Sequence, residues 1–381
     1  MAKKYPPQRT LRVHRVLKGA SLLPAVVKPK NEVIILAKIK EFLKRKDIVL
    51  SAKRYGIDAL GAMAQGLFCS LLVGTIVKTL GQQIGLQFFI DAGDFASAMS
   101  GAAMAVAIGY ALKAPALVLF SLATVGYAAN SLGGAGGPLA VLLIAIVAAE
   151  FGKAVSKETK IDILVTPIVT ILVGVGLAAL IAKPIGDAAL AIGSFIKQAT
   201  ELQPLLMGIV VSVTVGIALT LPISSAAICH AFLLTGLAGG AAVAGCCAQM
   251  VGFAVMSFRE NRWGGLVAQG IGTSMLQMPN IVKNPKIWIS PILASAITGP
   301  LATCLFKLEM NGAPVSSGMG TCGFVGQIGI ITGWAEKTVT AMDWAGLVLI
   351  CFVLPAVLTW LISLPLRKCG WIKENDLKLD L

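Results

Sequence analysis

Glu309 and Asn311 lie in an unusual stretch, LFKLEMNGAPVSSGMGTCGFVGQIG, which begins at Leu305 directly after an apolar run. A carboxylate accepts hydrogen bonds, whereas an amide both donates and accepts them. The glycines allow the backbone to turn and to approach a ligand closely. This set of groups suits the hydroxyls of a sugar, and the same set could hold a cation.

A second polar, glycine-rich stretch, GLVAQGIGTSMLQMPNIVKNP (265–285), repeats part of this pattern. Both stretches contain G-x-G-T followed by a small residue. Close packing of helices through glycine is one explanation. The other is a pair of broken, re-entrant hairpins, which are tolerated at membrane depth where they line a cavity and which often mark a transport site. We expect the hairpins, and therefore add to the candidate substrate-binding residues Thr273, Gln277, Asn280 and Thr321.

A third break is predicted in TLPISSAAICHAFLL, because Pro222 removes a helical hydrogen bond and clashes with the preceding turn. Ser224 and Ser225 could satisfy the freed backbone groups or face a ligand. His230 is the only histidine outside the N-terminal segment. For His230 a structural role and contact with a substrate or a proton remain equally open.

The composition places these residues in a membrane protein. Of the 381 residues, 56% are hydrophobic and 13% charged, and the mean hydropathy is +0.84. A membrane-crossing helix needs about 20 apolar residues. We therefore expect an all-α, polytopic transporter with about ten membrane segments, including the two re-entrant hairpins. The expected spans are 56–80, 86–112, 114–132, 136–153, 161–182, 204–222, 238–258, 287–306 and 343–366.

Neither a nucleotide-binding motif nor a metal-binding spacing is found, and the eight cysteines include no C-x-x-C. We expect no catalytic residue, no metal and no cofactor, so the chain is predicted to be a transporter and not an enzyme.

Positive charge is concentrated before the first span. Through Arg54 there are 15 Lys and Arg residues against three acidic ones, which gives +12 of the formal +14. Basic flanks are retained in the cytoplasm, and Arg367 and Lys368 predict the same side for the C-terminus. We expect a basic segment 1–54, a transport domain 55–366 and a short tail 367–381. The basic segment either binds anionic lipid through an amphipathic helix or only sets the topology; nucleic-acid binding is disfavoured, since aromatic residues are few.

A resemblance to a known family rests on four segments: YGIDALGAMAQGLFCSLLVGTI, LTLPISSAAI, GIGTSMLQMPNIVKNP and GPLATCLFKLEMNGAPVSSGMGTCGFVGQIG. They resemble the EIIC membrane component of the bacterial sugar phosphotransferase system (PTS), in a branch with perfringolysin-regulator-like proteins, over about residues 50–366. The resemblance implies a homodimeric sugar carrier in the bacterial cell membrane, with His230 and Glu309 contacting the sugar. Since the chain has no EIIA or EIIB domain, either a separate EIIB chain phosphorylates the sugar or transport is not coupled to phosphorylation.

Two other functions remain open from the residues alone. A secondary transporter could couple protons through Glu309 or His230, and a membrane sensor could use the basic segment to bind a regulator. Uptake driven by pH would indicate the first, and capture of a partner without uptake would indicate the second.

Overall fold

The computed structural model describes residues 30–336 and 338–379. It contains two compact units that divide between Arg45 and Lys46. The first unit contains helix α1 (Lys30–Arg45), where the sequence predicts an amphipathic helix. The guanidinium of Arg45 lies 5.4 Å from the centre of the Phe42 ring. Residues 1–29, which contain seven of the 15 Lys and Arg residues of the basic segment, lie outside the described part of the chain.

In the described residues of the second unit the regular secondary structure is helical, apart from one isolated β-bridge. Six helical stretches are long and apolar enough to cross a membrane, and a bent pair, α4 (Gln87–Ala98) with α5 (Ser100–Ala111), makes a seventh with a bend of 51°. The six stretches are Arg54–Ile84, Ala116–Val155, Asp162–Ala199, Gly236–Met256, Pro285–Leu305 and Ala341–Lys368. The prediction of a polytopic helical membrane protein is confirmed.

The first half of this unit is a bundle of antiparallel helices. It comprises η1 (Arg54–Asp58), α2 (Ala59–Leu67), η2 (Phe68–Leu72), α3 (Val73–Ile84), α4, α5, α6 (Ala116–Gly133), η3 (Gly134–Gly136), α7 (Gly137–Val155) and α8 (Asp162–Leu177). The stretch 116–155 is two helices, because Gly134 has a φ of +49° and the side chain of Val118 lies beside Gly152. Gly101 on α5 and Gly126 on α6 each leave room for the other's carbonyl group, so these two helices approach backbone to backbone.

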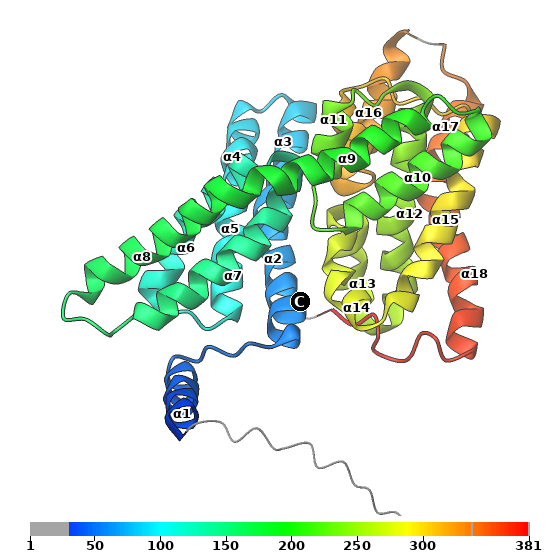
Figure 1. Ribbon diagram of the computed structural model, residues 1–381. Coiled ribbons are helices and arrows are strands. Elements are labelled where there is room, and N and C mark those ends of the chain that lie inside the picture. Colours follow the sequence, from blue (N-terminus) through cyan, green and yellow to red (C-terminus); the bar gives the residue numbers. More distant parts are fainter. Residues whose placement is uncertain (1–29, 337, 380–381) are drawn as a thin grey trace, which may run out of the picture. The chain divides into compact units, whose positions relative to one another are not determined.

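A long helix links this bundle to the second half (Figure 1). Helix α8 continues through η4 (Ala178–Ala182) into α9 (Lys183–Ala199). Gly136 in the first half packs against the backbone of Ile185 and Gly186, whereas Gly193 packs against Phe232 in the second half. Helix α9 therefore contacts both halves.

Helix α12 (Gly236–Met256) is the centre of the second half and is buried on all sides. Around it pack α10 (Pro204–Thr220), α15 (Ile289–Pro300) and α18 (Leu354–Lys368). At 1.5 Å per residue α12 is about 30 Å long, enough to span the hydrocarbon of a membrane. We refer below to its Gly236 end and its Met256 end.

The chain doubles back on itself at residues 311–333, a segment that we call the 311–333 hairpin. It contains η9 (Pro314–Gly318), η10 (Cys322–Phe324) and α16 (Val325–Gly333). It starts at the Gly236 end, where Gly236 and Met310 exchange two main-chain hydrogen bonds of 2.9 and 3.0 Å. At its tip Thr321 donates to the sulfur of Met250 at 3.6 Å. It then returns, so that Gly333 packs against Asn311.

A second reversal, the 258–284 hairpin, starts from the Met256 end. It contains α13 (Phe258–Val267), η5 (Ala268–Gly272), η6 (Ser274–Gln277) and α14 (Met278–Lys283). Its two legs are joined by a 2.9 Å hydrogen bond from Gln277 to Gln269, which itself donates to Ser257 at 2.8 Å. Its tip reaches Thr220, 2.8 Å from Ser274, and η5 contacts η10 of the other hairpin. The two G-x-G-T segments therefore meet beside α12 from opposite ends.

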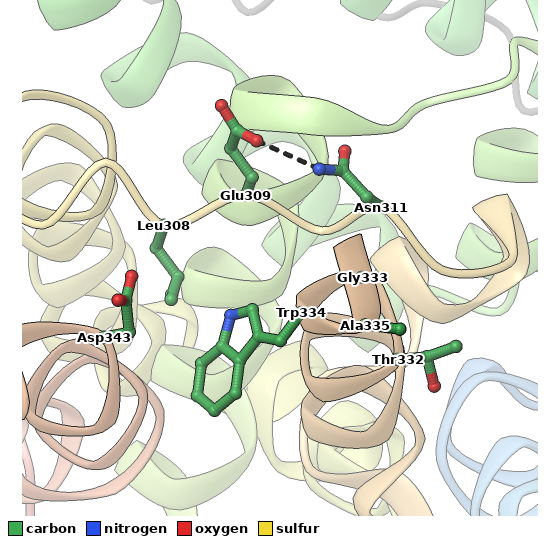
Figure 2. Close-up of a pocket in the computed structure, with 8 residues that line it drawn as sticks. All are labelled: Leu308, Glu309, Asn311, Thr332, Gly333, Trp334, Ala335 and Asp343. Atoms are coloured by element: carbon green, nitrogen blue, oxygen red, sulfur yellow. Dashed lines mark hydrogen bonds between the residues drawn. The ribbon is translucent and has the colours of Figure 1, made fainter. Parts of the chain in front are cut away.

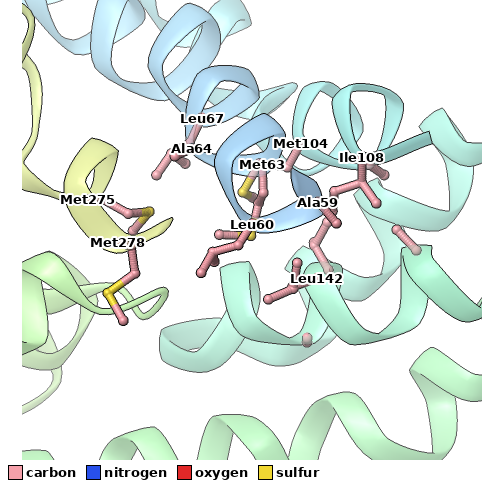
Figure 3. Close-up of a cluster of buried hydrophobic side chains, with 14 of the residues drawn as sticks. Ala59, Leu60, Met63, Ala64, Leu67, Met104, Ile108, Leu142, Met275 and Met278 are labelled. Atoms are coloured by element: carbon pink, nitrogen blue, oxygen red, sulfur yellow. The ribbon is translucent and has the colours of Figure 1, made fainter. Parts of the chain in front are cut away.

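A cluster of buried apolar side chains joins the 258–284 hairpin to the first half (Figure 3). Leu60 and Met63 of α2 face Met275 and Met278 of the hairpin on one side and α5 on the other. Methionine is flexible and fills irregular space. This contact can therefore adjust to small movements of the hairpin more easily than a contact of branched side chains.

Candidate functional site

A cavity of about 540 Å³ opens at the Gly236 end of α12, beside the start and the finish of the 311–333 hairpin (Figure 2). Its volume is in the range typical of small-molecule sites. The lining residues are Leu308, Glu309, Asn311, Thr332, Gly333, Trp334, Ala335 and Asp343. We call it the Glu309 cavity.

Glu309 and Asn311 lie next to each other on an extended segment, which places residues two apart on one face. The amide of Asn311 donates to a carboxylate oxygen of Glu309 at 2.9 Å, and both side chains are exposed. Gly239 and Gly240 hold this segment against α12, because a side chain at Gly240 would collide with the carbonyl group of Leu308. The carboxylate keeps further acceptor positions for the hydroxyls of a ligand.

Two other lining residues of this cavity, Trp334 and Asp343, were missed by the sequence reasoning. The indole of Trp334 forms one wall, and its ring centre lies 4.8 Å from that of Trp344 in an edge-on contact. Asp343 accepts from the main-chain N–H and the hydroxyl of Thr340 at 2.8 and 2.7 Å, which caps helix α17 (Ala341–Val348). Of the two carboxylates, Asp343 is thus occupied in a helix cap, while Glu309 is bonded to Asn311.

Helix α11 (Ser225–Ala231) and its N-cap residue Ser224 account for the three candidates near Pro222. Ser224 caps this helix by accepting from Ala227 N–H at 3.2 Å. Ser225 is buried and donates to the carbonyl oxygen of Gly318 at 2.7 Å. His230 is exposed and is not among the residues that line the Glu309 cavity. The break at Pro222 therefore joins α11 to the 311–333 hairpin, and its serines make structural hydrogen bonds.

The remaining candidates lie in the hairpins themselves. Thr273 and Thr321 are buried at the tips, 3% and 1% exposed. Gln277 and Asn280 are buried near the Met256 end, where they form a row of amides: Asn280 donates to Gln277 at 2.9 Å, and Gln277 donates to Gln269. Their distance from the Glu309 cavity is on the order of the length of α12, about 30 Å.

The C-terminal residues cover this row of amides. Gln277 donates to the carbonyl oxygen of Leu377 at 3.0 Å, and Asn280 donates to that of Lys378 at 2.8 Å. Leu377 is fully buried. The structure therefore separates the candidate residues into a group at the Gly236 end and a group at the Met256 end, with the buried tips between them.

In the part of the chain that the structure describes, no group of three or more His, Cys, Asp or Glu side chains could hold a metal ion.

One family model, described as "Phosphotransferase system, EIIC", matches residues 57–379. No curated protein and no solved structure matches the chain. EIIC is the membrane permease component of this system and not the phosphotransferase itself. The match also makes the chain a multi-pass protein of the plasma membrane. Because the match extends over most of the sequence, from η1 to the C-terminal residues, the chain belongs to the EIIC family of the phosphotransferase system.

Proposed function

We propose that this protein carries a sugar across the membrane and that the Glu309 cavity is the site where the sugar binds. The observation that carries the proposal is the arrangement of the two hairpins, which start at opposite ends of α12 and meet at their tips. A cavity at one end is thereby closed from the other end. Alternating access requires such a barrier together with a second state in which the barrier opens on the other side.

The orientation of the domain in the membrane is inferred from the distribution of its positive charge. Lys53 precedes the first span and lies at the same cavity as Lys283 and Lys378 of the C-terminal half. Basic residues are retained in the cytoplasm, so the Met256 end is assigned to the cytoplasm and the Glu309 cavity to the outside. Both ends of the transport domain then lie inside.

The Glu309 cavity offers a sugar three kinds of contact. The Glu309 carboxylate accepts hydroxyl hydrogen bonds, and the Asn311 amide both donates and accepts. The Trp334 ring supplies an apolar surface, as aromatic residues commonly do in ligand sites. Gln327 lies deeper on α16, where its amide oxygen has no hydrogen-bond partner among the described residues, and can accept from a sugar that moves inward.

The phosphoryl group is supplied by separate EIIA and EIIB chains, as the family implies. We propose in addition that the carrier works as a homodimer with a core and a scaffold domain. Helix α11 is bonded to the 311–333 hairpin beside the Glu309 cavity. In this proposal its residues Ser225 and His230, and its N-cap residue Ser224, act at the site through that helix. Thr273, Thr321, Gln277 and Asn280 belong to the path of the sugar past the tips.

The test is calorimetric titration of the detergent-purified protein with a panel of unphosphorylated sugars. Glu309→Gln keeps the shape but removes the charge, and we expect it to weaken binding by about ten- to a hundredfold, because a hydrogen bond to a charged group contributes about 1.5–3 kcal/mol. Asp343→Asn is the matched variant in the same cavity: it should lower the melting temperature by weakening the cap of α17, with a smaller effect on affinity.

Unchanged sugar affinity in a folded Glu309→Gln protein would remove Glu309 from the site. Binding that depends on pH and uptake driven by a proton gradient without phosphoenolpyruvate would replace the proposal with a proton-coupled transporter. Absence of binding across the panel, together with capture of a partner through the basic segment, would replace it with a sensor.

A further inference from the structure

A second cavity, of about 440 Å³, lies at the Met256 end, between the two halves of the membrane domain. It is bounded by the start of α2, the end of α5, the 258–284 hairpin and the C-terminal residues. Its polar lining residues are Lys53, Asp58, Gln65, Tyr110, Asn280, Lys283 and Lys378. We call it the lysine cavity.

The two cavities differ in the sign of their charge. The lysine cavity has three ammonium groups and one carboxylate, and the structure records no ion pair for Lys53, Lys283 or Lys378 within its described residues. The lining of the Glu309 cavity has two carboxylates and no cationic side chain. A phosphate ester would therefore be repelled by the Glu309 cavity and attracted by the lysine cavity.

Lys378 reaches the lysine cavity because the C-terminal residues are fixed in place. Asn261 donates to the carbonyl oxygen of Leu377 at 2.8 Å and accepts from the N–H of Leu379 at 2.8 Å. Asn280 donates to the carbonyl oxygen of Lys378. The C-terminal segment thus contributes one cation to the lysine cavity, and the cavity is incomplete without it.

We propose that the lysine cavity binds the phosphorylated sugar, a phosphomonoester, before its release into the cytoplasm. This inference rests on the proposed function, since it concerns the product of the same carrier. A phosphomonoester has a charge of about −1.5 to −2 at pH 7, which the three lysines and one aspartate of the cavity, with a net charge of +2, match. Lysine binds phosphate as a compact point charge. The amide nitrogen of Asn280 already donates to Gln277 and to the carbonyl group of Lys378, so its side-chain oxygen and the hydroxyl of Tyr110 are the groups that can bond the hydroxyls of the sugar ring.

The charge difference also explains how one carrier can handle both forms of a sugar. A neutral sugar forms hydrogen bonds with the carboxylates of the Glu309 cavity and is not repelled by their charge. Once it carries a phosphoryl group, the lysine cavity holds it and the Glu309 cavity rejects it. Backward movement of the product is then disfavoured by the two cavities themselves.

The experiment is calorimetric titration of the purified full chain with glucose 6-phosphate, mannose 6-phosphate and N-acetylglucosamine 6-phosphate, each compared with its parent sugar and with inorganic phosphate. We expect at least one ester to bind, and Lys283→Gln and Lys378→Gln each to weaken that binding by about tenfold or more. Added salt should weaken it as well. Lys286→Gln is the matched control: Lys286 is a cation of the same region that stacks on Trp371 at 5.2 Å and is not among the residues that line the cavity.

The results separate this inference from the proposed function. Binding of a parent sugar that is lost in Glu309→Gln, without binding of any ester, would overturn the inference and leave the proposed function intact. Inorganic phosphate binding as tightly as the best ester would overturn it too, because the sugar would then make no contact. Equal losses in Lys286→Gln, or lysine effects confined to the binding of a phosphorylated EIIB protein, would also contradict it. A melting scan of each variant verifies that it is folded.

Discussion

The hydroxyl of Ser225 donates to the carbonyl oxygen of Gly318 at 2.7 Å and so joins two breaks in the helical chain. Ser225 begins α11, directly after the break at Pro222, and Gly318 ends η9 of the 311–333 hairpin. Any side chain at Gly318 would press on the main chain of Ser225, 2.6 Å away. The position of the 311–333 hairpin therefore depends on α11.

Removing this bond should loosen the hairpin. In Ser225→Ala the carbonyl group of Gly318 loses its hydrogen-bond partner. We expect this to lower the free energy of unfolding by about 1–3 kcal/mol and to lower the melting temperature in detergent. Ser194→Ala is the control, because Ser194 is exposed and bonds only within its own helix. Equal melting temperatures for wild type and Ser225→Ala would show that the contact does not stabilise the fold.

The sequence was sufficient to predict the class of fold, but not every break in the helices: the expected span 86–112 is bent between α4 and α5, and the helix expected to end at 182 continues to Ala199. Runs of about 20 apolar residues and the glycine-rich segments have a direct physical meaning in a membrane. Gly320, with a φ of +54°, and Gly323, with a φ of +51°, do turn the chain at the tip of a hairpin. Polar character alone, however, does not tell from which end a hairpin starts. Asn280 and Asn311 were therefore grouped in one site, although they lie near opposite ends of α12.

The C-terminal residues show a second limit of prediction. The segment WIKENDLKLDL is short and mixed in polarity, which is typical of a solvated tail. In the structure Ile372 and Leu377 are buried, and carbonyl groups of the segment accept from Gln277 and Asn280. These contacts join residues about a hundred positions apart, and no local pattern reports them.

Leu377→Ala tests whether the C-terminal segment is part of the domain. Leu377 is fully buried, so shortening its side chain to alanine should lower the free energy of unfolding by about 2–5 kcal/mol and lower the melting temperature. Leu293→Ala, at a position 46% exposed on α15, should change it far less. Similar melting temperatures for both variants would contradict the docking of the segment.

The ion pair between Asp47 and Arg54 should make the stability of the fold depend on pH. The Asp47 carboxylate accepts from Arg54 at 2.7 Å, and this bond and the charge of Arg54 hold the pKa of Asp47 below its ordinary value of 3.8. A lowered pKa stabilises the fold above the unfolded-state pKa, and the contribution is lost as the pH falls through the folded-state pKa. Asp47→Asn should therefore be less stable than wild type at pH 7, by about 0.2–1 kcal/mol for an exposed pair, and the difference should shrink below about pH 4. A difference that stays constant from pH 7 to pH 3 would refute this role; Asp187→Asn, an exposed carboxylate on α9, is the control.

The basic N-terminal segment is predicted to be separable from sugar binding. Deleting residues 1–30 removes much of the positive charge and should weaken association with vesicles that contain anionic lipid, by roughly 1 kcal/mol for each cation near the surface. Sugar affinity, measured on the same protein, should be retained. Loss of sugar binding in a correctly inserted, folded truncation would show that this segment belongs to the transport machinery.

The most direct test of the two opposed hairpins is the side from which single cysteines react with a membrane-impermeant maleimide. The exposed native cysteines Cys69, Cys304 and Cys369 are first replaced by alanine. Asn311→Cys and Ala335→Cys, which flank the first hairpin, should both react from the outside, whereas Gly264→Cys and Lys283→Cys in the second should both react from the inside. Reaction of Asn311→Cys and Ala335→Cys from opposite sides would mean that the intervening segment crosses the membrane, and it would contradict the account.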